Sequence, residues 1–252
     1  MTAPVASVIV PAHEEGEHIV PGLTRILDAV ETPSEIVVVV DSADDSTTGP
    51  VLRLAKKHPR LRLDVNQYGR GPANAIRWGI AHAEAPIVVV TMADGCDDPR
   101  QIDELVRLID RGVVVAAASR YMAGGQQVGG ARFKTFLSRT AGQTLRLFAN
   151  VGTRDATNSF KAYRRSFVEE VGIDSRHGFE IGLELTAKAR RMRLPVAEIP
   201  TIWLDRTAGS SRFRLASWIP KYLRWYRFAF GPRLTAAQLR NALDRARPKG
   251  EK

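Results

Sequence analysis

Residues 5–14 read VASVIVPAHE and residues 35–45 read EIVVVVDSADD, and in both an unbroken apolar run ends in polar, mostly acidic residues. A continuous run of Val and Ile is typical of a strand buried on both faces of a parallel sheet. Three similar runs follow, separated by amphipathic stretches of helical length. The predicted strands are Val5–Val10, Ile36–Val40, Leu61–Val65, Ile87–Thr91 and Val113–Ala118, and the predicted helices cover about 15–30, 46–58, 71–83 and 99–111. This alternation predicts an α/β fold with a mostly parallel central sheet flanked by helices.

The second half of the chain is less regular. We expect helices over Phe133–Val151 and Gly178–Met192, a polar loop and strand over Asp155–Tyr163, and an extended apolar segment over Pro195–Leu204. The last residues, Asn241–Lys252, are polar and contain Pro and Gly, so we expect disorder there.

Composition excludes several classes of protein. The 252 residues carry a formal net charge of +10, with 44% hydrophobic and 25% charged residues. These proportions exclude a disordered, collagen-like or wholly membrane-embedded chain. The positive excess lies entirely in Arg206–Lys252, which contains 12 basic and 2 acidic residues. The single cysteine, Cys96, and an N-terminus without a leader pattern favour a cytoplasmic setting, and no apolar run approaches the roughly 18 residues of a membrane-spanning helix.

Polar side chains follow the predicted strands at the points where those strands end. In open α/β sheets ligands bind beyond the carboxyl ends of the strands, so these residues are candidates for a site. Acidic residues follow three of the runs, within 11–15, 41–45 and 94–98. Helix capping explains some of them, notably Ser46 and the Asp98 that precedes Pro99. Three acidic tips at one sheet edge would repel one another unless they share a cation or a donor-rich ligand, which favours a binding site.

Nine segments, in order along the chain, carry a resemblance to a known family. They are SVIVPAHEEGEHI (7–19), VVDSADDST (39–47), GRG (69–71), VVTMADGCDDP (89–99), SRYMAGG (119–125), LSRTAG (137–142), DATNSFKAYRR (155–165), GFEIGLEL (178–185) and EIPTIWLDRTAGSSRF (198–213). Together they resemble a family-2 glycosyltransferase, and within that family the dolichol-phosphate or polyprenol-phosphate sugar (mannose) synthases. The resemblance implies a GT-A fold and an inverting transfer of sugar from a GDP- or UDP-linked donor to a polyprenyl or dolichyl phosphate at the cytoplasmic face of a membrane.

The resemblance also implies a divalent cation, Mg²⁺ or Mn²⁺, that neutralises the leaving nucleoside diphosphate and binds hard oxygen ligands. Asp94 is the first candidate ligand. The chain departs from the family at this point, because the usual Asp-x-Asp motif reads Met92-Ala93-Asp94. Asp97 or Asp98 would then supply the missing carboxylate.

The remaining family positions divide into a donor side and an acceptor side. On the donor side the resemblance assigns Pro11, Ala12, Glu14 and Asp41 to the nucleotide, and Arg70 and Arg206 to the diphosphate. On the acceptor side it assigns Arg120, Lys134, Ser138 and Arg139 to the acceptor phosphate. Lys134 and Ser138 are four residues apart and share one helix face, as a phosphate clamp requires.

The kind of acceptor decides whether a general base is needed. A lipid monophosphate is already ionised near neutral pH, whereas a sugar hydroxyl must lose its proton. With a hydroxyl acceptor, Asp155 or Glu184 would be the candidate base. With a phosphate acceptor, the same two carboxylates would orient the donor sugar or a loop.

Residues 214–230, RLASWIPKYLRWYRFAF, place aromatic and aliphatic side chains on one side of a helix and Arg and Lys on the other. A helix of this kind lies in a membrane interface, although its apolar face could instead pack on the domain core or form a homodimer contact. Pro220 favours a helix that begins near Trp218. We therefore predict a catalytic domain over 1–212, an interfacial helix over 213–232, and a basic, partly disordered tail over 233–252.

Other functions remain as alternatives. A soluble family-2 glycosyltransferase could act on a saccharide or a small-molecule hydroxyl, and Met92 also leaves open a catalytically silent membrane scaffold. A nucleic-acid-binding module would suit the sequence pI of about 10.2 but leaves the acidic tips unexplained. The expected partners are therefore an NDP-sugar, a polyprenyl phosphate and a peripheral membrane surface, and not nucleic acid.

Overall fold

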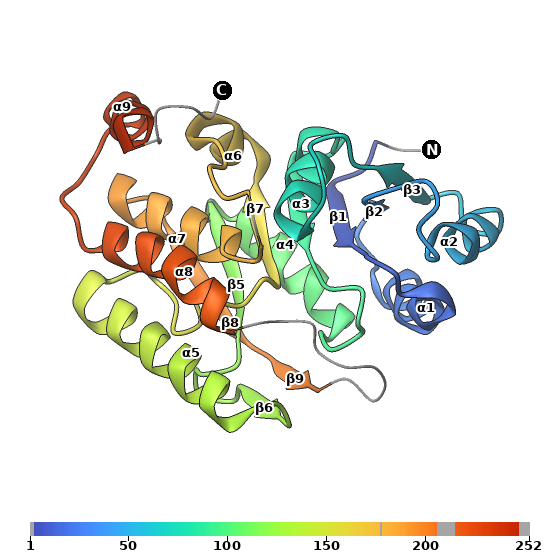
Figure 1. The fold of residues 1–252 in the computed structure, drawn as a ribbon, viewed down its shortest axis with the longest axis horizontal. Helices are drawn as coiled ribbons and strands as arrows, with labels where there is room; N and C mark the ends of the chain where they lie inside the picture. Colours follow the sequence, from blue (N-terminus) through green and yellow to red (C-terminus); the bar gives the residue numbers. More distant parts are fainter. Residues whose placement is uncertain (1–2, 177, 206–214, 247–252) are drawn as a thin grey trace.

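A mostly parallel sheet forms the centre of the computed structural model, which describes residues 3–176, 178–205 and 215–246 (Figure 1). In this part of the chain the sheet has seven strands in the order β3-β2-β1-β4-β7-β5-β8. Their bounds are β1 Ala6–Pro11, β2 Ser34–Val40, β3 Leu61–Val65, β4 Ile87–Val90, β5 Val115–Ser119, β7 Lys161–Arg164 and β8 Val196–Pro200. Strand β7 runs antiparallel to both β4 and β5, whereas the other pairs are parallel. The α/β architecture expected from the sequence is confirmed.

Helices cover both faces of this sheet. The α-helices are α1 Ile19–Ala29, α2 Thr48–Ala55, α3 Pro72–Ala81, α4 Ile102–Asp110, α5 Arg132–Thr144, α6 Arg165–Val171, α7 Ile181–Met192, α8 Leu215–Ala229 and α9 Ala236–Ala246, with 3-10 turns η1 Gly16–His18 and η2 Pro99–Gln101 and a π-helical turn η3 Leu145–Ala149. Alternate strand residues belong to two separate cores: Val38 packs in the one with α1 and α4, and Val37 and Val39 in the one with α3 and α7. This explains the unbroken Val and Ile runs, because both faces of each strand are buried.

The extended apolar segment expected over Pro195–Leu204 is divided between two sheets. After β8, the Thr201 N–H donates to the Ser119 carbonyl of the large sheet, and the Thr201 carbonyl accepts the Gln126 N–H. The chain then continues as β9, Ile202–Leu204, which pairs in parallel with β6, Gln126–Val128. Thr201 is therefore the point where the chain leaves the large sheet for the small one.

Two expectations for the C-terminal region are wrong. The disorder expected over Asn241–Lys252 does not hold for 241–246, because these residues belong to α9, where Leu239 and Leu243 are buried in the core with α3 and α7; 247–252 lie outside the described residues. Helix α8 begins at Leu215 and not near Trp218, so Pro220 lies inside it. Packing of α8 on α7 supplies the stabilisation that offsets the backbone hydrogen bond lost at the proline.

A buried charged cluster ties α7 to its neighbours. Lys188 Nζ donates to Glu184 Oε1 at 2.6 Å and to Asp174 Oδ2 at 2.8 Å, and Glu184 also accepts the N–H groups of Asp174 and Ser175. The indole N–H of Trp225 in α8 donates to Ser175 Oγ at 2.9 Å. Glu184, Lys188 and Trp225 are all buried. The cluster therefore fastens α7, α8 and the loop after α6 together.

Replacing Lys188 with Met should destabilise the fold strongly, because Asp174 and Glu184 would remain buried without their cation. We expect the free energy of unfolding to fall by about 3–5 kcal/mol, measured by urea denaturation. Arg53→Gln is the matched control, since the Arg53–Glu17 pair is largely exposed and should contribute nothing measurable. Equal stability of the Lys188 and Arg53 variants would contradict the role of the cluster.

Candidate active site

The polar tips expected at one sheet edge do come together there. Strands β1, β2, β4 and β5 reach the carboxyl edge of the large sheet at Pro11, Val40, Val90 and Ser119. Pro11 and Ala12 are buried, and the Ala12 N–H donates to the Val39 carbonyl of the neighbouring strand. The loops that follow these strands therefore start from a fixed, hydrogen-bonded edge.

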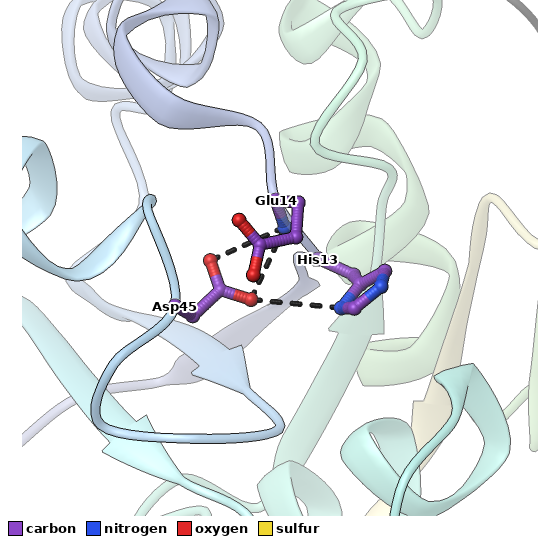
Figure 2. A group of neighbouring side chains, drawn as sticks. All are labelled: His13, Glu14 and Asp45. Atoms are coloured by element: carbon purple, nitrogen blue, oxygen red, sulfur yellow. Dashed lines mark hydrogen bonds and ion pairs between the residues drawn. The ribbon is translucent and has the colours of Figure 1, made fainter.

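The loops after β1 and β2 are fastened to each other by Asp45 (Figure 2). Both carboxylate oxygens of Asp45 accept the Glu14 N–H, at 3.2 and 3.1 Å, and one also accepts the Thr47 N–H at 2.9 Å. Glu14 has a φ of +54°, which a non-glycine residue adopts only where its surroundings hold it. Asp45, and not the expected Ser46, makes the polar contact at the start of α2. The Glu14 side chain remains exposed at the edge of the site.

His13, Glu14 and Asp45 also bring potential metal-binding atoms within 4.8 Å of one another. His13 Nδ1 lies 3.6 Å from Asp45 Oδ2, while Asp45 is already engaged by backbone N–H groups. The contacts of this group hold the loop after β1 to the loop after β2.

Asp41 fixes the loop that carries Arg70. Its Oδ2 accepts the Gly71 N–H at 2.9 Å, and its Oδ1 accepts Asn66 Nδ2 at 3.1 Å. Gly71 has a φ of +116° at the start of α3, a conformation that favours glycine. Arg70 itself is exposed, so Asp41 positions the loop on which this cation is carried.

The three aspartates after β4 have different surroundings. Asp98 caps η2 and is paired with the exposed Arg100, through Nη2 at 2.7 Å. Asp97 is buried, and its Oδ2 accepts Thr91 Oγ1 at 3.0 Å and the Met92 N–H at 3.2 Å. Burial and the neighbouring Asp94 raise the pKa of Asp97 to about 6. Asp94 and Asp97 are therefore the two carboxylates of this loop that could hold a divalent cation between them.

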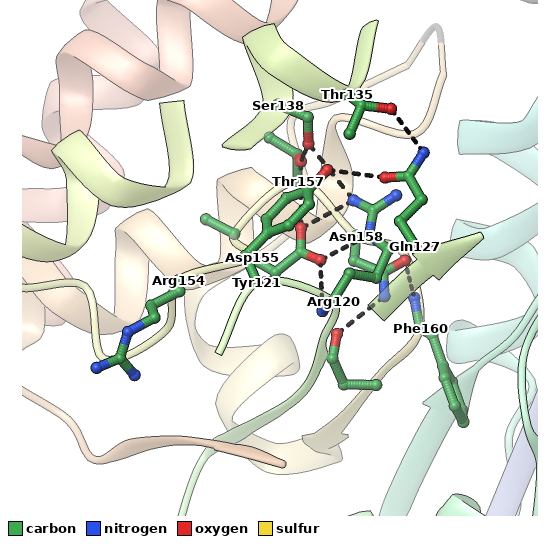
Figure 3. A network of polar contacts seen from close by, with 12 residues as sticks. Arg120, Tyr121, Gln127, Thr135, Ser138, Arg154, Asp155, Thr157, Asn158 and Phe160 are labelled. Atoms are coloured by element: carbon green, nitrogen blue, oxygen red, sulfur yellow. Dashed lines mark hydrogen bonds and ion pairs between the residues drawn. The ribbon is translucent and has the colours of Figure 1, made fainter. Parts of the chain in front are cut away.

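The expected acceptor side centres on a largely buried ion pair between Arg120 and Asp155 (Figure 3). Arg120 donates to Asp155 through its backbone N–H at 3.0 Å, Nε at 2.7 Å and Nη2 at 2.9 Å. Burial opposes both charges, but the pairing outweighs it, so the pKa of Arg120 is raised and that of Asp155 is lowered. Arg120 and Asp97 also feel each other's charge. Arg120 and Asp155 are therefore held in their charged forms next to the loop that carries Asp97.

The loop that carries Asp155 is held from two sides. Glu198 of β8 accepts the Arg154 N–H at 2.7 Å and Thr153 Oγ1 at 3.0 Å. On the other side, the buried Lys161 ammonium donates to the carbonyls of Asp155, Ala156 and Asn158. Burial lowers the pKa of Lys161 to about 7. The position of Asp155 is thus determined by its neighbours before any ligand binds.

Helix α5 brings the expected phosphate-binding side chains beside this pair. Ser138 Oγ lies 3.4 Å from Arg120 Nη2 and 2.7 Å from Thr157 Oγ1. Lys134 lies one turn earlier on the same face and is half-buried, whereas Arg139 is exposed on the next face. The structure therefore brings Arg120, Ser138 and Lys134 to one side of the site.

Glu184 has a different role from the expected one, and Arg206 cannot be placed. Both oxygens of Glu184 belong to the buried cluster described above, so its carboxylate holds the loop after α6. Arg206 lies outside the described residues, as do the residues up to 214.

Sequence reasoning missed the residues that hold the site together. These are Asp45, Asn66, Tyr121, Gln127, Thr135, Thr153, Thr157, Lys161 and Glu198. One of them carried a signal: a lysine inside a short apolar strand, such as Lys161, must find buried acceptors.

Comparison with known proteins identifies the family. The model of Glycosyl transferase family 2 matches residues 7–172. The chain belongs to this glycosyltransferase family. Polyprenol monophosphomannose synthase of Mycolicibacterium smegmatis is 28% identical over 84% of the chain and 85% of that protein. Dolichol-phosphate mannosyltransferase of Pyrococcus furiosus is 29% identical over 86% of the chain, which spans only 61% of that longer protein.

Solved structures share the GT-A fold of this glycosyltransferase. Glucosyl-3-phosphoglycerate synthase of Mycobacterium tuberculosis, in complex with Mn²⁺, UDP and glucosyl-3-phosphoglycerate, superposes with a TM-score of 0.67 at 16% identity, covering 92% of this chain and 82% of that one. A mannosyltransferase of Pyrobaculum calidifontis in complex with GDP-Man and Mn²⁺ gives a TM-score of 0.59 at 21% identity, covering 98% and 77%. These likenesses confirm the expected fold.

Gly142 of α5 packs against the loop that carries Asp155, on the side of the site where we expect the acceptor. A Cβ at this position would lie 1.9 Å from the Arg154 carbonyl oxygen, which is backbone of the Asp155 loop. Gly142→Ala should therefore push α5 away from this loop. We expect at least about a hundredfold loss of sugar transfer, since misplacement by about 1 Å has that effect.

Gly49→Ala in α2 is the matched control for Gly142→Ala. A Cβ at Gly49 meets only the far end of the Arg53 side chain at 3.4 Å, and alanine favours a helix. We expect unchanged turnover for this variant, with both proteins first checked for folding by circular dichroism. Full activity of a folded Gly142→Ala protein would show that the contact has no role in positioning the site.

Proposed function

We propose that this glycosyltransferase moves a sugar from a nucleoside diphosphate donor to a polyprenyl or dolichyl phosphate at the cytoplasmic face of a membrane. The observation that carries the proposal is the cationic acceptor side, where the buried Arg120 and the half-buried Lys134 lie beside Ser138. The names of the relatives, a polyprenol monophosphomannose synthase and a dolichol-phosphate mannosyltransferase, support the same acceptor class.

Arg120 is suited to bind an anion that arrives from outside. Its Nε and Nη2 are engaged by Asp155, and no hydrogen bond to Nη1 is made by the described residues. The guanidinium can therefore offer its remaining edge to a phosphate while Asp155 keeps it in place. Lys134 would add a second positive charge from α5.

The proposed reaction forms one bond and breaks one. An oxygen of the ionised acceptor phosphate attacks the anomeric carbon of the donor sugar, and the bond from that carbon to the diphosphate breaks. No proton has to be removed from a phosphate whose second pKa is about 6 by analogy with phosphoserine. The carboxylates of Asp155 and Glu184 are fully engaged, and the pKa of Asp155 is lowered. Both are therefore suited to orienting roles and not to general base catalysis.

The leaving nucleoside diphosphate needs positive charge on the donor side. We assign this role to Mg²⁺ or Mn²⁺ held by Asp94 and Asp97, with Arg70 facing the diphosphate. When bound, the cation would supply electrostatic stabilisation of the leaving group. Pro11, Ala12, Glu14 and Asp41 would face the nucleotide, and the assignment of Arg206 to the diphosphate remains a prediction from the family resemblance.

The direct test is a donor-by-acceptor screen with purified protein. GDP-mannose, UDP-glucose and related donors are each combined with a short-chain prenyl phosphate, a free sugar or a prenyl alcohol, with and without Mn²⁺. We expect nucleoside diphosphate release only with the prenyl phosphate and the metal. Release with the sugar and not with the phosphate would overturn the proposal in favour of a soluble transferase for a hydroxyl acceptor.

Three substitutions separate the aspartates after β4. Asp94→Asn and Asp97→Asn should each lower Mn²⁺-dependent turnover by at least about a hundredfold, since loss of a ligand removes charge stabilisation of several kcal/mol. Asp98→Asn is the control, because asparagine still caps η2 and Asp98 is paired with Arg100. We expect it to keep the Mn²⁺ response. Loss of that response in Asp98→Asn alone would mean that Asp98, and not Asp94 or Asp97, binds the metal.

Lys134 should act mainly on acceptor binding. Lys134→Ala should raise the KM for the prenyl phosphate by about tenfold, with a smaller change in kcat, because it removes one charge-assisted contact of about 1.5 kcal/mol. Lys134→Arg should restore the KM. A KM that is unchanged in the alanine variant would remove Lys134 from the acceptor site.

A further inference from the structure

Helix α5 and the η3 turn expose a row of large apolar side chains. Phe133, Phe136, Leu147 and Phe148 have exposed fractions of 64, 64, 72 and 75%. They form two groups along one face of the helix, and Thr144 occupies the same face between the two groups. Single apolar residues on a surface are ordinary, but four large exposed ones along one helix face indicate a binding surface.

Helix α8 carries a second row. Ile219, Leu223 and Phe230 have exposed fractions of 47, 36 and 42%. Tyr226 lies on the same helix face, between Leu223 and Phe230. The adjoining face of α8 packs inward, with Trp225 and Ala229 in the core. The core packing considered for this helix therefore accounts for only part of its apolar surface.

The two rows meet. Tyr226 donates its hydroxyl to Thr144 Oγ1 at 2.9 Å, which joins a member of the α8 row to a position within the α5 row. Tyr226 also packs against Phe230, with ring centroids 5.2 Å apart. Figure 1 shows α8 lying next to α5, and α8 contacts η3. The exposed side chains of the two rows form one two-helix apolar surface.

The charges around this surface have a single sign. The segments 129–150 and 215–235 contain no Asp or Glu, whereas each contains four basic residues. Of these, Arg132 and Arg139 on α5 and Arg224 and Arg227 on α8 are exposed. Apolar side chains flanked by cations suit a bilayer interface with anionic headgroups. In a symmetric dimer through the same surface, the cations of one copy would oppose those of the other.

We propose that the two-helix apolar surface docks on an anionic lipid bilayer and that α5 thereby sets the acceptor clamp at the level of the lipid headgroups. The second clause rests on the proposed function, which assigns Lys134 and Ser138 of this same helix to the acceptor phosphate. A lipid phosphate emerging from the bilayer would meet Lys134 and Arg120 while its hydrocarbon chain stays in the membrane. Among the described helices none is long and apolar enough to cross a bilayer.

Vesicle co-sedimentation tests the docking. The full chain is mixed with vesicles of phosphatidylcholine alone or of phosphatidylcholine with phosphatidylglycerol. We expect much stronger binding to the anionic vesicles. The double variants Leu147→Ser/Phe148→Ser and Leu223→Ser/Phe230→Ser should each weaken it by at least about tenfold, since both remove large apolar groups from the interface.

Charge and specificity are tested separately. Arg132→Gln and Arg227→Gln should each weaken binding to anionic vesicles by about fivefold, with no effect on neutral ones. Leu52→Ser is the matched control, because Leu52 is 48% exposed on α2, outside the two-helix apolar surface. It should bind as the parent does.

Two results would overturn the docking: no binding of the parent to anionic vesicles, or binding that the double variants retain. A parent dimer in solution that the double variants convert to monomers would also overturn it, by assigning the surface to a second copy. The double variants should keep turnover of a water-soluble short-chain prenyl phosphate without vesicles. If the parent turns over that acceptor but does not bind vesicles, only the docking fails; if it binds vesicles but turns over no prenyl phosphate, only the proposed function fails.

Discussion

Arg120 and Asp155 form an ion pair in which the carboxylate is fully buried and the guanidinium almost so. Removing two charges from water is costly, so such a pair is stable only when its geometry is good and the other polar atoms are satisfied. Both oxygens of Asp155 accept hydrogen bonds from Arg120, and the backbone on either side of Asp155 is held by Glu198 and Lys161. The pair therefore requires the loop that carries Asp155 to adopt a single conformation, and the surrounding residues hold the loop in it.

The position of α5 follows from this loop. Gly142 lets the helix approach the Arg154 carbonyl more closely than any residue with a Cβ could, and Ser138 then reaches both Arg120 and Thr157. Gln127 of β6 links Tyr121 to Thr135 of α5. The same helix carries its exposed apolar row on another face. One rigid element thus connects the buried ion pair to the proposed membrane surface.

Much of the fold could be predicted from the sequence because β1, β2 and β4 are rich in Val and Ile and are buried on both faces. The site residues at the strand ends followed from the geometry of parallel sheets. Strand β7 was expected, but not its antiparallel direction, since four residues such as KAYR carry no information on which neighbour they pair with. The division at Thr201 was missed because the pattern of Pro195–Leu204 is continuous. Helix α9 was missed because its stability comes from burying Leu239 and Leu243 against distant residues.

The supporting residues of the site were hidden from the sequence for a related reason. Asp45 resembles its neighbour Asp44, and only the approach of Glu14 from another loop distinguishes them. Likewise Asp97 and Asp98 are adjacent and chemically identical, yet one is buried next to Asp94 and the other caps a turn. Local patterns locate a cluster of carboxylates, but tertiary contacts decide which of them face the site.

The structure offers a physical explanation for the charge distribution of the chain. The proposed reaction brings a diphosphate and a phosphate together, and like charges of this size repel strongly in a site of low dielectric. The donor side carries carboxylates, which can hold a divalent cation, whereas the acceptor side carries the permanent cations Arg120 and Lys134. Asp97 and Arg120 interact across the boundary between the two sides, so each lowers the cost of keeping the other ionised. Most of the described part of the basic C-terminal segment lies in α8 and α9, and α8 adds its exposed cations to the outer face of the proposed acceptor side. Positive charge is thus concentrated where we propose that an anionic lipid binds. Negative charge lies where a divalent cation would bind and make the local charge positive.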